Sequence, residues 1–192
     1  MEIRKILYRK EMKLVTLLLT SMLIATASAT VYYSLVMQAT VTTQAPEVKF
    51  VAGNDSTAAG ATGGDLTDAW VRMGSLKAYP NASLTYDQAV NISCTGANHQ
   101  IKLTHSSITD GTSAVSNFTS IKFELIAANA SQMGTDFTYS NANGDNNWDS
   151  TPSMSYVNML ATEEWAVKVT ITAVAGAAAN AVIAIVINLD VK

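Results

Sequence analysis

The chain has 192 residues, a formal net charge of −3, and 48% hydrophobic against 14% charged residues. Nucleic-acid binding draws on clustered Lys and Arg, so this acidic balance argues against nucleic acid as a partner. The length suits one domain with a hydrophobic core of its own.

An uncharged stretch from Leu14 to Met37 begins with the pattern of a secretory leader. Lys10 and Lys13 precede the apolar block LVTLLLTSMLIA, and the small residues Ala27-Ser28-Ala29 follow it in the A-x-A order that a signal peptidase requires. The pattern predicts residues 1–29 as a signal peptide that is cleaved after Ala29. Met12 is an alternative start codon to Met1.

Removal of this leader leaves 163 residues. The leader holds five of the 12 basic and two of the 15 acidic residues, which leaves a formal net charge of −6. Proteins, cations and saccharides are therefore the expected classes of partner, and a membrane is expected to matter only during export.

The rest of the uncharged stretch has the pattern of a β-strand. Apolar side chains occupy every odd position from 31 to 41, whereas the even positions include Thr, Ser and Gln. This period of two is typical of a strand with one buried face. We expect residues 30–45 to form an extended strand followed by a hinge. The apolar face of that strand is Val31, Tyr33, Leu35, Met37, Ala39 and Val41.

A transmembrane anchor is the alternative interpretation, because 24 uncharged residues exceed the roughly 20 that span a bilayer core. Polar and β-branched residues in the second half argue against it, since a lipid-facing helix is apolar all round. A retained helix of the type IV pilin kind is a further variant. The residues ahead of the apolar block, Arg9 to Lys13, lack the Gly or Ala that its processing site usually shows.

Residues 46–192 are expected to form a β-sandwich domain. Alternating patterns predict strands near 47–51, 83–93, 101–104, 120–125, 154–159, 164–172 and 182–191, and the last is expected to be a central strand. Ala69 to Met73 fits either a strand or a helical turn, and Gly53 to Gly64 is expected to be a long flexible loop. Seven to nine antiparallel strands indicate an all-β sandwich of jelly-roll or immunoglobulin-like type.

Sugars are one expected modification of this exported chain. Five N-x-S/T sequons stand at Asn54, Asn81, Asn91, Asn117 and Asn129. Cys94 is the only cysteine, so no intrachain disulfide can form, and we expect it to be a small buried residue.

Metal binding and catalysis find little support in the sequence. Asn143, Asp145 and Asp149 are candidate calcium ligands in an Asn- and Asp-rich segment, but Gly144 and Pro152 depart from the EF-hand pattern, so a polar turn without metal is favoured. No cofactor is expected. The two histidines and the carboxylates have the positions of ordinary sheet residues: His99, His105, Glu163 and Glu164. No catalytic motif is present, so we do not expect an enzyme.

Several segments resemble archaeal bundling pilins, which are related to the TasA and camelysin biofilm-fibre proteins. They are TVYYSLVMQATVTT, VKFVAGNDSTAAGA, AYPNASLTYDQAVNI and TEEWAVKVTITAVAGA, which together span most of the mature chain. Archaeal cannula subunits are similar at a greater distance. The resemblance implies a jelly-roll subunit whose N-terminal segment completes the sheet of the next subunit.

The resemblance thus implies a secreted structural subunit of an extracellular filament at the cell surface, a bundling pilus or biofilm-matrix fibre. Its partners would be identical subunits joined head to tail by donor-strand complementation, together with neighbouring filaments, and it would support adhesion and biofilm cohesion. A membrane-anchored binding module, such as an adhesin or an S-layer-associated domain, is the alternative function.

Overall fold

The computed structural model describes residues 10–22, 46–62, 69–109, 115–149, 152 and 154–192. The chain divides into two compact units, Met1–Thr43 and Gln44–Lys192, which we describe separately. In the first unit, residues 10–22 form a helix whose side chains are exposed. The predicted cleavage site after Ala29 and the predicted strand and hinge, residues 30–45, lie outside the described residues.

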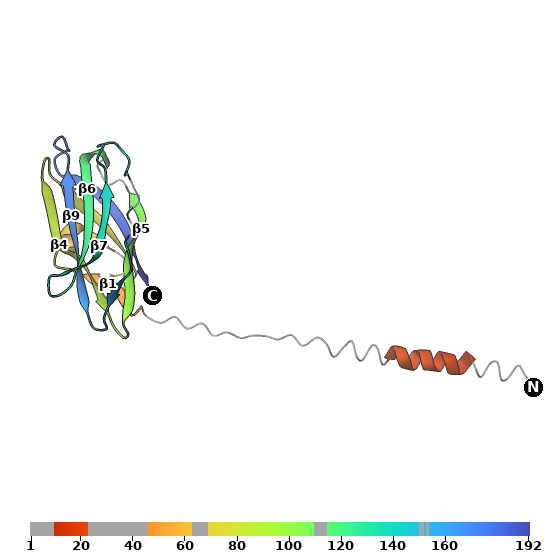
Figure 1. Ribbon diagram of the computed structural model, residues 1–192. Coiled ribbons are helices and arrows are strands. Elements are labelled where there is room, and N and C mark those ends of the chain that lie inside the picture. The colour runs from red at the N-terminus through yellow and green to blue at the C-terminus, as the bar shows by residue number, and fades with distance from the viewer. Residues whose placement is uncertain (1–9, 23–45, 63–68, 110–114, 150–151, 153) are drawn as a thin grey trace, which may run out of the picture. The chain divides into compact units, whose positions relative to one another are not determined.

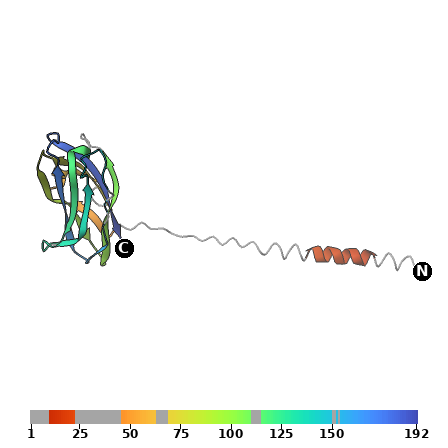
Figure 2. The ribbon, with the colours of Figure 1, turned by 45° about the horizontal axis from the view of Figure 1, so that its top comes forward.

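The second unit is a sandwich of two β-sheets (Figure 1 and Figure 2). Its elements are β1 (Val48–Ala52), α2 (Ser56–Ala59), β2 (Ala61–Thr62), β3 (Trp70–Ala78), β4 (Ser83–Cys94), β5 (His99–Thr109), η2 (Val115–Asn117), β6 (Phe118–Ile126), β7 (Gln132–Ser140), β8 (Val157–Met159), β9 (Glu164–Ala173) and β10 (Ala181–Val191). The first sheet has the order β1-β4-β9-β6-β7 and the second β2-β3-β10-β5-β8. Every strand pairing in both sheets is antiparallel.

The strand order is that of a jelly roll. When β1 and β2 are set aside as added edge strands, the eight remaining strands form two four-stranded sheets, β4-β9-β6-β7 and β3-β10-β5-β8, as in two interlocked Greek keys. The prediction of an all-β, jelly-roll-like sandwich is therefore confirmed, and the immunoglobulin-like alternative is not. The predicted central position of the last strand is also confirmed, because β10 is the middle strand of its sheet.

Alternation along the strands builds the core. In β9 the side chains at every odd position from Trp165 to Ala173 are buried, and the even positions are at least partly exposed. Aromatic side chains fill one region between the sheets, where the ring centroids of Phe137 and Tyr139 lie 5.6 Å apart and those of Phe123 and Phe137 lie 5.8 Å apart. These edge-to-face contacts add to the free energy gained from burying the rings.

The outer face of the first sheet carries a row of hydroxyl groups. Ser83 of β4 lies opposite Thr172 of β9, which lies opposite Ser120 of β6, which in turn lies opposite Ser140 of β7. The Ser83 and Thr172 hydroxyl oxygens are 3.0 Å apart. Four neighbouring strands thus present short polar side chains to one surface.

The prediction of a long flexible loop from Gly53 to Gly64 is wrong for the described part of this segment, which contains α2 and β2. Asp55 holds this part in place, because its carboxylate accepts a hydrogen bond from the Gln88 N–H at 3.0 Å and its own N–H donates to the Gln88 carbonyl at 3.0 Å. In the ambiguous segment from Ala69 to Met73, the residues from Trp70 onwards belong to β3 and pair with β10, whereas Ala69 precedes the strand.

Candidate functional site

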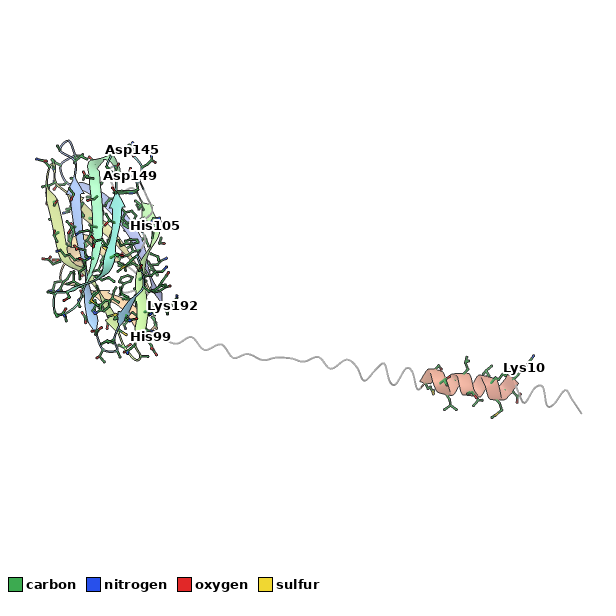
Figure 3. All side chains as sticks on the ribbon, viewed as in Figure 1. Lys10, His99, His105, Asp145, Asp149 and Lys192 are labelled. Carbon is green, nitrogen blue, oxygen red and sulfur yellow. The ribbon has the colours of Figure 1, made fainter. Side chains whose placement is uncertain are left out.

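The candidate site is a groove at one end of the sandwich, beside the residue where the N-terminal segment joins the domain. Its lining is mainly apolar and comes from segments far apart in the sequence: Pro46, Val48, Ala69, Leu189 and Val191, with Glu47 and His99 adding polar groups. Figure 3 shows His99 and Lys192 at this end of the domain and Asp145 and Asp149 at the other.

The groove forms where the end of β10 extends beyond the hydrophobic core. Ile187, Leu189 and Val191 alternate along the same side of this strand, with exposed fractions of 0%, 4% and 40%. Across the groove, Val48 of the edge strand β1 is buried and Pro46 is exposed. An apolar surface therefore extends from the core to solvent at this end.

A hydrogen bond between Glu47 and His99 closes one side of the groove. The Glu47 carboxylate accepts a hydrogen bond from His99 Nε2 at 2.8 Å and another from the Ala97 N–H at 3.3 Å. The hydrogen bond from His99 is the main cause that lowers the pKa of the Glu47 carboxyl below its ordinary value of 4.5. The other ring nitrogen, His99 Nδ1, lies 3.4 Å from the Lys192 carbonyl oxygen. These contacts connect the residue before β1 with the first residue of β5 and the residue after β10.

Gly96 allows the turn beside this carboxylate to approach closely. Its φ is +95°, and a Cβ atom there would lie 2.8 Å from the Glu47 Cδ. Thr95 completes the attachment, because its N–H and its hydroxyl both donate to the Glu47 carbonyl, at 2.7 and 3.0 Å. The residue that follows Pro46 is thus fixed to the domain by both its backbone and its side chain.

The residues predicted to form the apolar face of the N-terminal strand lie outside the described residues: Val31, Tyr33, Leu35, Met37, Ala39 and Val41. The structure therefore describes Pro46, the first residue after the predicted strand and hinge, but neither of those segments.

The five sequons fall into two groups. Asn54, Asn81 and Asn129 are exposed in the segments that connect strands. Asn91 and Asn117 are only partly exposed. The Asn91 Nδ2 donates to Glu164 Oε1 at 2.6 Å and its Oδ1 is buried, while the Asn117 Oδ1 accepts from the Ala178 N–H at 2.7 Å.

The three candidate calcium ligands belong to a turn that is stabilised by hydrogen bonds. Asp149 accepts from the Ala142 N–H at 2.7 Å and from Asn143 Nδ2 at 3.4 Å, and Asp145 accepts from the Asn147 N–H at 2.8 Å. The described part of the chain gathers no group of three His, Cys, Asp or Glu side chains that could hold a metal ion. The favoured interpretation, a polar turn without metal, stays a prediction, and calcium binding by Asn143, Asp145 and Asp149 stays its untested alternative.

The histidines and the paired glutamates have separate partners. His105 Nδ1 lies 2.8 Å from the hydroxyl of Tyr139 in the opposite sheet, and burial raises the pKa of that hydroxyl. The Glu163 carboxylate accepts from the Leu160 N–H at 2.7 Å, whereas Glu164 pairs with Asn91. Each of these side chains therefore has a partner within the sheets or their turns.

Cys94 is buried and carries a free thiol, and burial raises the pKa of that thiol. Its expected place as a small buried residue is confirmed. The groove itself was missed, because no local sequence pattern brings Val48 and Val191 together. The only sequence signal that bore on it was Pro46, which separates β1 from the preceding segment.

No protein-family model matches the chain, and no curated protein sequence matches it. Within the described residues, none of the helices is both long enough and apolar enough to cross a bilayer.

Proposed function

We propose that this chain is a secreted structural subunit of an extracellular filament. Each subunit donates the strand Thr30 to Thr43 to a neighbouring subunit, and the filament grows by this head-to-tail donation. The resulting fibre belongs at the cell surface, where it supports adhesion and biofilm cohesion.

The observation that carries the proposal is that the alternating segment directly precedes an edge strand of the jelly roll in the sequence. The apolar alternation covers positions 31 to 41, and Pro46 lies between it and β1, which is an edge strand of its sheet. An edge strand offers unpaired backbone groups to another strand. A donated strand supplies the hydrogen-bonding partners, while its alternate side chains fill pockets.

The length of the segment suits donation to another subunit. Thr30 to Thr43 comprises 14 residues, which extend over about 46 Å at the rise of a β-strand. Donation from one subunit to the next uses two different surfaces, so the contact does not close on itself and it propagates a filament.

Deletion of Thr30 to Thr43 tests the proposal. We expect the full chain to form filaments in electron micrographs of secreted material, and the deletion variant to remain as separate folded subunits. Leu35→Asp, on the apolar face, should also prevent assembly, whereas Ser34→Asp, on the polar face, should permit it. Filaments formed by the deletion variant would refute donor-strand assembly.

Intact-mass measurement of the extracellular protein separates the proposal from the membrane-anchored alternative. Filament assembly requires a free N-terminus at or near Thr30. A mature protein that retains the Leu14 to Met37 stretch would favour the anchored binding module.

A further inference from the structure

We propose that the groove between β1 and β10 is the acceptor site for the donated strand, and that its occupant is the Thr30 to Thr43 segment of a second copy. This inference rests on the proposed function and adds to it the surface on which the strand docks.

The hydrophobic core is incompletely covered at the groove. Val191 points to the same side of β10 as the buried Ile187 and Leu189, yet it is 40% exposed. Ala69 and Pro46, which also line the groove, are exposed. Apolar side chains inserted here would continue the core and remove this surface from water, which is favourable in proportion to the area buried.

The edge strand β1 also directs backbone groups away from its own sheet. The Thr95 N–H donates to the Glu47 carbonyl, so Glu47 and Thr95 form a hydrogen-bonded pair. In an antiparallel ladder such pairs alternate, which directs the backbone N–H and C=O of Val48 away from β4. Since the sheet order places no described strand on that side of β1, an incoming strand would meet backbone groups as well as apolar side chains.

The lining of the groove matches the composition of the donated segment. Five of the seven residues that line the groove are apolar, and the Glu47 carboxylate already accepts a hydrogen bond from His99. The segment from Thr30 to Thr43 contains no charged residue, so it would bring no unpaired charge into the groove. Its larger apolar side chains, Tyr33, Leu35 and Met37, are the ones available to cover Val191.

Val191→Glu tests the site in the full chain. The exposed end of β10 should accept the charge without unfolding, and we expect filament assembly to be lost while the circular dichroism spectrum and melting temperature stay close to those of the parent. Tyr79→Glu is the matched control, because Tyr79 is 44% exposed and directly follows the end of β3. The end of β10 that carries Val191 lies near the other end of β3, where Asn188 pairs with Trp70. That variant should assemble normally.

Disulfide trapping identifies the occupant. Val191→Cys in one preparation is mixed with Tyr33→Cys, Leu35→Cys or Met37→Cys in another, and we expect oxidation to give a mixed disulfide between different chains in at least one mixture. Thr85→Cys, on the exposed outer face of β4, should give none. A disulfide formed only within one chain, in a dilute sample that carries both substitutions, would show that the segment fills its own groove and would overturn the inference.

The outcomes separate this inference from the proposed function. If deletion of Thr30 to Thr43 abolishes filaments but Val191→Glu still assembles and no mixed disulfide forms, the groove is not the acceptor and donor-strand assembly stands. If the deletion variant forms filaments, the proposed function fails together with the inference.

Discussion

At the scale of single residues, Glu47 fixes the start of the described jelly-roll unit, directly after Pro46. Its backbone carbonyl accepts from Thr95, its carboxylate accepts from Ala97 and His99, and Gly96 leaves room for that carboxylate. In the proposed filament, a force along the donated strand would act on the domain through this residue, which these contacts hold in place.

This attachment should depend on pH. Because the pKa of the Glu47 carboxyl is lowered in the folded protein, its contribution to stability is present above the ordinary value of 4.5 and is lost as the pH falls through the lowered value. We expect acidification below about pH 4.5 to reduce the melting temperature of unassembled subunits. Glu47→Gln should show a smaller decrease over the same range. Asp87→Asn, an exposed control, should behave like the parent, and an unchanged slope for Glu47→Gln would contradict the assignment.

The sequons give a second prediction about single residues. In the folded protein, Asn54, Asn81 and Asn129 are exposed, whereas the Asn91 side chain is held by Glu164 and the Asn117 side chain by Ala178. If the native host glycosylates this chain after folding, glycans should be found on the first three residues. Mass spectrometry of glycopeptides checks this, and a high occupancy at Asn91 would contradict it.

At the scale of elements, β9 shows how strictly the two faces of a strand differ. Ile171 is fully buried, while its neighbour Thr170 is partly exposed on the outer face. Ile171→Ala should lower the free energy of unfolding by about 2–5 kcal/mol, because it removes buried methyl groups and leaves a cavity. Thr170→Ala should cost less than about 1 kcal/mol. Chemical denaturation of the full chain measures both, and equal effects would show that the predicted faces are wrong.

The strands that could be predicted are those with a clear period of two. β5, β6, β9 and β10 were all expected near their observed positions, because their buried faces carry Ile, Leu, Val, Phe or Trp at alternate positions. β7 was missed. Only Phe137 and Tyr139 of its nine residues are buried, and Gly134 and the bulge opposite Phe123 and Leu125 break the alternation.

The short elements depended on tertiary contacts that no local pattern reveals. α2 has four residues, and the Asp55 contacts with Gln88 of β4 position it. The candidate groove could not be predicted for the same reason. Its walls come from the beginning of β1, the residue before β3 and the end of β10, and only the jelly-roll order brings these segments together.

At the scale of the whole molecule, the jelly roll leaves edge strands on both sheets, with β1 and β7 at the edges of one and β2 and β8 at the edges of the other. An unpaired edge strand can pair with a strand of any other chain. A subunit that assembles in one defined way must therefore pair through one edge while its other edges stay unavailable for pairing. Three of these edges are short, since β1, β2 and β8 have five, two and three residues. Donation to the groove beside β1 would direct association to a single place.

The hydroxyl row on the outer face of the first sheet lowers the side-chain entropy that is lost when another surface covers that face. Ordering an exposed Lys side chain costs up to about 2 kcal/mol of conformational entropy, whereas short side chains have few rotamers to lose. Here the row consists of Ser83, Thr172, Ser120 and Ser140, and the neighbouring Lys122 is already held by Glu124 at 3.1 Å. Another surface, such as that of an adjacent filament, can therefore cover this face with little loss of side-chain entropy.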